Sequence, residues 1–201
     1  MNEILNQEIY AKLLLASDIV ILDTETTGLE DPEVCEITVI DSQGNVLLDS
    51  LVKPSKPVSV QAKLIHGITS EMLSTAPTWP EIHEDFIKAT VGKTVLIYNA
   101  EFDEKAIDNT IKAAGLDSYP FRSECVMEMF AAYNGEENEY WGGYKWKNLV
   151  FAANSFGINP DGAHRAKSDC LMTLGVLKGM AGELDTPEPE KKVKSRNRNK
   201  P

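Results

Sequence analysis

The chain has 201 residues, of which 42% are hydrophobic and 25% are charged, as in ordinary soluble globular proteins. No apolar run approaches the roughly 18 residues of a membrane span, and the N-terminus lacks the basic start of a secretory signal, which argues against both of these classes. The net charge of −11 argues against binding nucleic acid through a broad basic surface.

A helix and three strands are predicted at the start of the chain. The segment MNEILNQEIYAKLLLASD favours a short amphipathic helix. Apolar runs predict strands at 18–23, 34–41 and 46–53. The SQGN between the second and third strands is typical of a hairpin turn, so these two strands are expected to be antiparallel.

Short helices and a buried strand are predicted next. QAKLIHGITSEML indicates two short helices that are separated by Gly67, with Thr69 or Ser70 capping the second. WPEIHEDFIKAT carries apolar residues at helical spacing, and TVLIYN, at 94–99, predicts another buried strand.

Helices dominate the rest of the chain. AEFDEKAIDNTIKAAG predicts a helix that ends at Gly115. Its inner face is expected to hold Phe102, Ala106, Ile107 and Ile111. Further helices are predicted in VMEMFAAYNG, KNLVFAANSFGI and AKSDCLMTLGVLKGMAG. An antiparallel hairpin followed by parallel units predicts one α/β domain, residues 1–184, with a mixed sheet flanked by helices.

The segment NGEENEYWGGYKWKN is polar and rich in glycine, which predicts a loop. Its Tyr140, Trp141 and Tyr144 interleave with lysines, a pattern that can stack single-stranded bases or simply pack the loop. Trp146 is expected to pack the following helix onto the sheet.

The composition changes at about Asp185, and residues 185–201 predict a disordered basic tail. Residues 191–200 hold six of the 20 Lys+Arg and none of the 31 Asp+Glu, so the remainder carries 14 minus 31, or −17. The tail could bind nucleic acid or a partner, although a solubilising role is the expectation. The acid excess elsewhere is either solvated surface or carboxylates gathered for cations.

ILDTETTGLE, residues 21–30, ends an apolar strand in two acids that are one residue apart. Because side chains alternate along a strand, Asp23 and Glu25 project to one side and Thr24 to the other. Neighbouring carboxylates repel, and a divalent cation such as Mg²⁺ or Mn²⁺ would relieve that repulsion. The alternative is that both acids lie exposed at a sheet edge.

A third acid, Asp103, follows the strand that ends at Asn99. Asn99 is placed to cap the next helix, and Asp103 then falls in its first turn. Asp103 could simply complement the helix dipole. Alternatively it belongs to the same site, because sites collect at the ends of strands in α/β sheets.

HRAKSD supplies a fourth acid, Asp169, together with His164. Residues five apart lie about 140° apart on a helix, so the two cannot share one helical face. The loop signal Asn159-Pro160-Asp161-Gly162 instead places His164 in or beside a loop and Asp169 on the helix behind it. Four acids and one histidine suit two-metal phosphodiester hydrolysis, with the imidazole as the base. A plain surface or core histidine is the alternative.

DTETTG, NAEFD and HRAKSD, in this order and with IHGIT between the first two, resemble the three motifs of the DEDDh 3′→5′ exonucleases. This family has the ribonuclease-H-like fold and includes the proofreading subunit of the bacterial replicative polymerase and ribonuclease T. The resemblance runs from about residue 17 to residue 182. It implies a five-stranded mixed sheet flanked by helices.

The resemblance also implies roles for individual residues. Asp23, Glu25, Asp103 and Asp169 would hold two Mg²⁺ or Mn²⁺ ions, and His164 would be the general base. A second group would bind the 3′-terminal nucleotide: Thr26, Gly28, Leu29, His66 and Asn99. For His66 a plain helix-end histidine is the alternative.

The implied reaction is removal of 5′-mononucleotides, one at a time, from the 3′ end of single-stranded nucleic acid, with DNA favoured over RNA. Two alternatives stay open: an oligoribonuclease-like RNA-processing exonuclease, and a polymerase-associated subunit that binds a replication partner through the tail. No membrane partner is expected. Three widely spaced cysteines without a CxxC pattern favour a reducing compartment, so a cytoplasmic location is predicted.

Overall fold

The computed structural model describes residues 3–184. The predicted tail, residues 185–201, lies outside the described residues, so its role stays a prediction. No helix within residues 3–184 is both long and apolar enough to cross a membrane.

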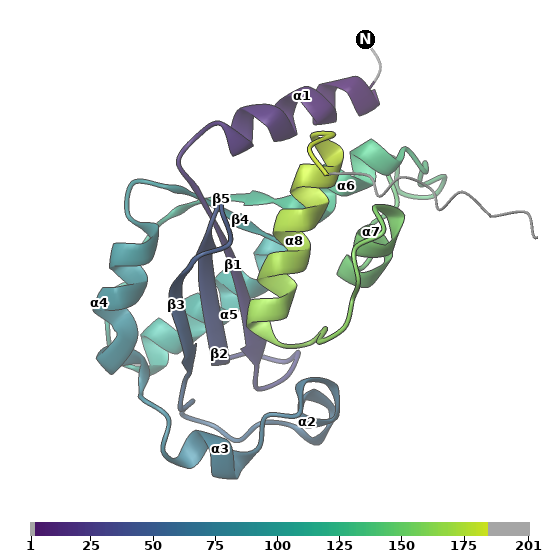
Figure 1. Cartoon of the computed structure of the whole chain (residues 1–201). Helices are drawn as coiled ribbons and strands as arrows, with labels where there is room; N and C mark the ends of the chain where they lie inside the picture. The colour runs from purple at the N-terminus through teal and green to yellow at the C-terminus, as the bar shows by residue number, and fades with distance from the viewer. Residues whose placement is uncertain (1–2, 185–201) are drawn as a thin grey trace, which may run out of the picture.

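A mixed five-stranded sheet forms the centre of the fold (Figure 1). The strands are β1 (Ile19–Thr26), β2 (Val34–Asp41), β3 (Val46–Leu51), β4 (Thr94–Ile97) and β5 (Arg122–Cys125). Their order in the sheet is β3-β2-β1-β4-β5. β2 is antiparallel to both β1 and β3, whereas β4 runs parallel to β1 and β5 runs parallel to β4. The predicted α/β fold with a mixed sheet is confirmed.

Helices cover both faces of the sheet. They are α1 (Glu3–Leu15), α2 (Val60–His66), α3 (Ser70–Ser74), α4 (Trp79–Thr90), α5 (Ala100–Ala113), α6 (Val126–Asn134), α7 (Leu149–Ser155) and α8 (Ala166–Met180). α4 and α5 pack on one face, and α1, α6, α7 and α8 pack on the other. The short helices α2 and α3 lie beyond the lower end of the sheet in Figure 1.

Alternation along β1 supplies both cores. Ile19 and Ile21 are buried in the core that includes α8, whereas Val20 and Leu22 are buried against α4 and α5. The strand is therefore apolar on both faces until it reaches its last residues, as expected for a strand at the centre of a sheet. The next residue, Asp23, continues the same alternation with a charge.

The two short helices are confirmed, together with the break between them. Gly67 ends α2 in the left-handed conformation, at φ 73°, and its N–H donates to the carbonyl of Lys63. Thr69 is the N-cap of α3, and its side chain accepts a hydrogen bond from the N–H of Met72. Glycine suits the first position because it has no Cβ to clash there.

Two expectations about helix faces are wrong. α1 buries Ala11 and Leu14 and packs Tyr10 and Leu15 partly against the core, but it also carries large apolar side chains on its exposed face, so it is not the amphipathic helix that was expected. The exposed ones are Ile4, Leu5, Ile9 and Leu13. In α5, Phe102 is only half-buried, because the buried positions are 103, 106, 107, 110 and 111, and Phe102 is one residue out of that register.

The loop after α6 forms a small hairpin. Glu137 and Tyr144 form an isolated bridge at its base, and Tyr140 and Trp141 at its tip are 92% and 90% exposed. Trp146 is 63% exposed, so the expectation that it packs α7 onto the sheet is wrong. Instead the hydroxyl of Tyr98 donates to the carbonyl of Lys147 at 2.8 Å and joins this segment to the end of β4.

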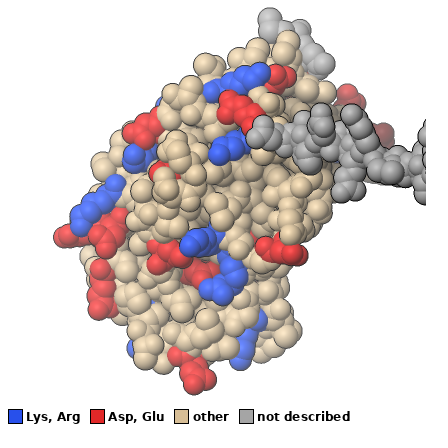
Figure 2. Space-filling model, in the orientation of Figure 1, with Lys and Arg blue, Asp and Glu red and all other residues tan. Residues whose placement is uncertain are grey.

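Charges of both signs are interspersed on the face of the molecule that carries α8 (Figure 2). Among residues 3–184, no broad field of Lys and Arg covers that face. This arrangement agrees with the net charge of the chain and offers little long-range attraction for a polyanion.

Candidate active site

The carboxyl ends of β1 and β4 meet beside the start of α8. Leu22 of β1 is paired with Ile97 of β4, so Asp23 follows directly where β4 ends. α5 begins three residues after Ile97, and its first turn lies at the same edge of the sheet. In α/β sheets this edge is where ligands bind.

Three carboxylates form a cluster at this edge. One oxygen each from Asp23, Glu25 and Asp169 lies within 4.8 Å of the other two. Asp23 and Glu25 come from β1, and Asp169 comes from the first turn of α8. The predicted projection of the two β1 acids to the same side is what brings them together with α8.

Asp103 is held by Thr24, the residue of β1 that was predicted to project to the side opposite Asp23 and Glu25. Its Oδ1 accepts hydrogen bonds from the backbone N–H of Thr24 at 3.0 Å and from the Thr24 hydroxyl at 2.6 Å. Asp103 is 4% exposed and does not belong to the three-acid cluster. Thr24 is therefore a site residue that sequence reasoning missed, although its alternation in DTET was the available signal.

The cluster concentrates negative charge in a buried place. Burial, with the charges of Asp103 and Asp169 adding to it, raises the pKa of Asp23 well above its ordinary value. Burial and the charge of Asp169 raise the pKa of Glu25 to about 8. For Asp103 and Asp169, burial raises the pKa to about 7 and about 6. The four carboxylates are therefore harder to ionise together than carboxylates in water.

Hard oxygen donors with mutual repulsion are a donor set that fits a divalent cation such as Mg²⁺ or Mn²⁺. The cluster of Asp23, Glu25 and Asp169 offers three such oxygens within reach of one ion. Asp103 keeps a second oxygen that Thr24 does not use. The geometry thus supports the predicted metal ligands, three of them directly.

His164 lies in the loop that leads into α8, as predicted. Its side chain is exposed, and its backbone has a φ of 66°, a left-handed conformation that is uncommon outside glycine. Its N–H donates to Oδ1 of Asp169 at 3.1 Å. Among residues 3–184 its imidazole has no hydrogen-bond partner, which leaves the ring free for a proton.

The loop after β1 carries the residues predicted to contact a nucleotide. The Thr26 hydroxyl donates to the carbonyl of Gly28 at 3.2 Å. Gly28 has a φ of 154°, and a Cβ there would lie 3.1 Å from the Ser59 hydroxyl, so a larger residue would crowd α2. Leu29 is 83% exposed at the surface of this loop.

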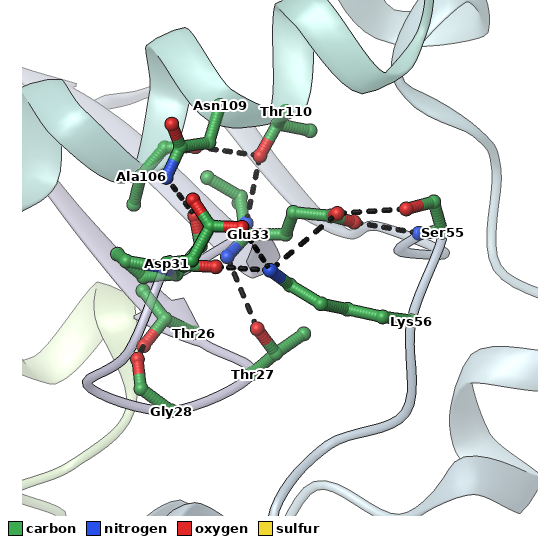
Figure 3. A network of polar contacts seen from close by, with 12 residues as sticks. Thr26, Thr27, Gly28, Asp31, Glu33, Ser55, Lys56, Ala106, Asn109 and Thr110 are labelled. Carbon is green, nitrogen blue, oxygen red and sulfur yellow. Dashed lines mark hydrogen bonds and ion pairs between the residues drawn. The ribbon is translucent and has the colours of Figure 1, made fainter.

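A buried polar network holds that loop in place (Figure 3). Glu33 accepts hydrogen bonds from the N–H and the hydroxyl of Ser55, both at 2.7 Å. The hydroxyl of Thr110 on α5 accepts the N–H of Val34 at 2.8 Å. The same network ties Lys56 to Asp31. Nothing in the spacing of these residues pointed to this network.

His66, the last residue of α2, supports this loop through a hydrogen bond to Thr26. Its Nδ1 accepts the N–H of Ile68 at 3.0 Å, which leaves Nε2 to donate to the carbonyl of Thr26 at 3.2 Å. The side chain is 6% exposed, and burial lowers its pKa. Because both ring nitrogens are occupied within the protein, His66 is placed to hold Thr26 rather than to bond a nucleotide itself.

Asn99 is the N-cap residue of α5, as predicted, but its side chain makes no capping hydrogen bond. Its backbone is left-handed, at φ 74°. Strained backbone at non-glycine residues collects at functional sites, and here it occurs at both Asn99 and His164.

Comparison with known proteins places this geometry among exonucleases. A family model described as Exonuclease matches residues 20–177. The uncharacterized exonuclease CP81 of Escherichia phage 186 is 45% identical over 179 residues, 85% of this chain and 92% of that protein. Exodeoxyribonuclease 10 of Escherichia coli strain K12 is 30% identical over 164 residues, 78% of this chain and 66% of that protein.

A solved structure titled Exonuclease X in complex with 5′ overhanging duplex DNA shares the fold, with a TM-score of 0.59 and 27% identity. The match covers 82% of this chain and 91% of that one.

Proposed function

Because this chain belongs to the DEDDh family of 3′→5′ exonucleases, we propose that it hydrolyses single-stranded DNA from the 3′ end to 5′-mononucleotides. The observation that carries the proposal is the cluster of Asp23, Glu25 and Asp169, with Asp103 bonded to the intervening Thr24. We propose DNA rather than RNA because one similar protein is named an exodeoxyribonuclease and a similar structure was solved as a complex with DNA.

Asp23, Glu25 and Asp169 would hold the metal, with Asp103 supporting a second ion. Bound Mg²⁺ or Mn²⁺ supplies charge for the phosphoryl oxygens and lowers the pKa of a water. The protein positions these ligands on rigid elements, β1 and α8, so that little reorganisation is needed during the reaction. Thr24 fixes Asp103 in the orientation that keeps one of its oxygens unused.

His164 would take the proton from the attacking water. Histidine is the side chain that most often takes or gives a proton in enzyme reactions near neutral pH. Its exposed ring can approach a substrate from the solvent side, while its backbone N–H stays on Asp169. The base and one metal ligand are thereby linked through a single hydrogen bond.

Thr26, Gly28 and Leu29 would grip the 3′-terminal nucleotide. Gly28 allows close approach of a backbone, and the exposed Leu29 offers an apolar surface for a base. Asn99 would contact the same nucleotide from the start of α5. We propose that His66 supports Thr26, in place of the direct nucleotide contact that the sequence led us to expect.

A gel time course on 5′-labelled single-stranded DNA and RNA of one sequence, with Mg²⁺ or Mn²⁺, tests the proposal. We expect a ladder that shortens from the 3′ end, faster for DNA, and abolished by EDTA. His164→Ala should lower the rate by about 10²- to 10⁴-fold, the usual contribution of a general base.

His83→Asn is the matched control, because His83 lies on α4 and its side chain bonds, within the described part of the chain, only to Trp79. It should digest DNA like the wild type. Intact bands with every metal would contradict the proposed activity, and a faster RNA lane would favour the oligoribonuclease alternative. The alternative of a polymerase-associated subunit depends on residues 185–201, and deleting them would test it by loss of a co-purifying polymerase.

A further inference from the structure

The first turn of α8 is fastened to the sheet by a buried carboxylate that the proposed reaction does not use. Glu36 on β2 is 5% exposed. Its oxygens accept hydrogen bonds from Nε of Arg165 at 3.1 and 3.2 Å, and from Nη2 of the same residue. It also accepts the N–H of Ala166 at 3.0 Å, which is the first amide of the helix.

Glu36 faces the active site because of the strand register. It is paired with Glu25 across the antiparallel β1–β2 ladder, so both side chains lie on the α8 face. Like charges at directly opposed positions destabilise a sheet. Arg165 is the cation that contacts Glu36, and it approaches from α8, not from either strand.

Arg165 directly follows His164 in the chain. The left-handed backbone of His164 is strained, and such a conformation persists only where the surrounding structure holds it. Hydrogen bonds on both sides hold this residue. The backbone N–H of His164 donates to Asp169, and the side chain of the next residue, Arg165, donates to Glu36. Arg165 is the N-cap residue of α8, but its side chain makes no capping hydrogen bond. What this side chain contributes at the start of the helix is its contact with Glu36.

We infer that Glu36 and Arg165 form a clamp that positions His164 for its step, with neither residue touching substrate or metal. The inference rests on the proposed role of His164 as the base. Without the clamp the first turn of α8 stays packed, through its buried Ala166 and Cys170, but the residue before Arg165 is free to leave its strained conformation. The clamp therefore positions His164 and is not required for the helix to fold.

The test is a double-mutant cycle on the full chain, with single-stranded DNA and Mn²⁺. Arg165→Ala should lower kcat by about 10- to 100-fold, as displaced supporting residues do, with KM little changed. In the His164→Ala background the same substitution should cost nothing further, because the group it positions is gone. Arg165→Lys, which keeps the charge, should recover part of the rate, and Glu36→Gln should resemble Arg165→Ala.

Lys167→Ala is the control. Lys167 lies in the first turn of α8, like Ala166, but it pairs with Asp49 of β3 at 3.9 Å and does not contact Glu36. It should keep the wild-type rate. Equal losses from Arg165→Ala in both backgrounds would overturn the clamp, as would wild-type kcat in Arg165→Ala when His164→Ala is slow. If His164→Ala itself keeps the wild-type rate, the proposed base is wrong and the clamp is overturned with it. Melting temperatures of all variants establish that each one is folded.

Discussion

At the scale of single residues, the acids at the end of β1 oppose folding unless a cation is present. Burial and the charge of Asp169 raise the pKa of Glu25 to about 8, and burial raises that of Asp169 to about 6, against ordinary values near 4. Between about pH 4 and pH 8 the folded chain thus binds more protons at these groups than the unfolded chain. Their contribution to the free energy of unfolding falls as the pH rises through this interval.

We therefore predict that the metal-free protein loses thermal stability from about pH 5 to about pH 8. Mn²⁺ should raise the melting temperature more at the higher pH, because it binds deprotonated ligands. Differential scanning calorimetry in EDTA and in Mn²⁺ measures both effects. A pH-independent increment from Mn²⁺ would show that the cluster is not the binding site.

Asp23→Asn should stabilise the metal-free protein at about pH 8 while abolishing hydrolysis, because burial and neighbouring charges raise the pKa of Asp23 well above its ordinary value. The amide keeps the shape of the side chain and removes its charge from the cluster. Urea unfolding in EDTA measures the change, and Asp18→Asn is the control, because Asp18 is an exposed residue that pairs with Lys93. A destabilised Asp23→Asn protein would contradict the view that charge repulsion dominates this site.

Much of the site could be predicted at this scale, and the exceptions have a physical cause. The spacing of Asp23 and Glu25 determines their common side, because alternation is a local property of a strand. The partners of Thr24 and Glu36 lie 79 and 129 residues away in sequence, so no local pattern could indicate them. His66 was placed correctly on its helix, but only the fold shows that both of its nitrogens are used.

At the scale of elements, α8 carries a flat surface that receives the segment leading to His164. Gly175 and Gly179 lie one turn apart on α8, against Ile158 and Phe156 respectively. A Cβ on Gly179 would lie 2.4 Å from the Phe156 ring, and a Cβ on Gly175 would lie 2.7 Å from the terminal methyl of Ile158. The ring is also packed against Phe130, so it has little room to move.

We predict that Gly179→Ala destabilises the protein by about 1 to 3 kcal/mol, as overpacking of a core does. Gly175→Ala should cost less, because the end of Ile158 is flexible and alanine favours the helix. Urea denaturation midpoints of the two variants give the comparison. If Gly179→Ala is as stable as Gly175→Ala, the ring is not held as tightly as its contacts indicate.

Elements with strong periodicity were easy to predict, and those without it were not. The predicted segment WPEIHEDFIKAT coincides with α4, in which apolar residues recur at helical spacing. The predicted segment VMEMFAAYNG covers α6 and adds Gly135, its left-handed C-cap. β5 was expected as a fifth strand but not located, since RSEC is a four-residue edge strand without an apolar run. Its place is determined by pairing with β4, which is a long-range interaction.

At the scale of the whole molecule, the distribution of charge would limit how long the protein holds the proposed DNA substrate. The first 190 residues carry a net charge of −17, and Lys and Arg are interspersed with acids on the face that carries α8 (Figure 2). Affinity for a long strand depends largely on contacts between cations and phosphates. The proposed grip on the terminal nucleotide does not supply many such contacts.

We therefore predict distributive digestion, with the enzyme leaving after one or a few nucleotides. A time course started on labelled DNA and then challenged with excess unlabelled DNA measures this directly. The ladder should stop within a few steps of the challenge. Continued shortening of the same labelled strands would contradict the prediction and would indicate a binding surface that the charge distribution does not reveal.

The position of α8 after all five strands in the sequence has a consequence for the newly made protein. Cys170 of α8 contacts the carbonyls of Ile21 and Thr38, and Asp169 beside it completes the acid cluster, so the site joins segments nearly 150 residues apart in sequence. Contacts of such long range form late in folding. A chain still emerging from the ribosome has made Asp23 and Glu25 but not His164 or Asp169. The proposed nuclease therefore stays inactive until α8 has been made and has packed against β1 and β2.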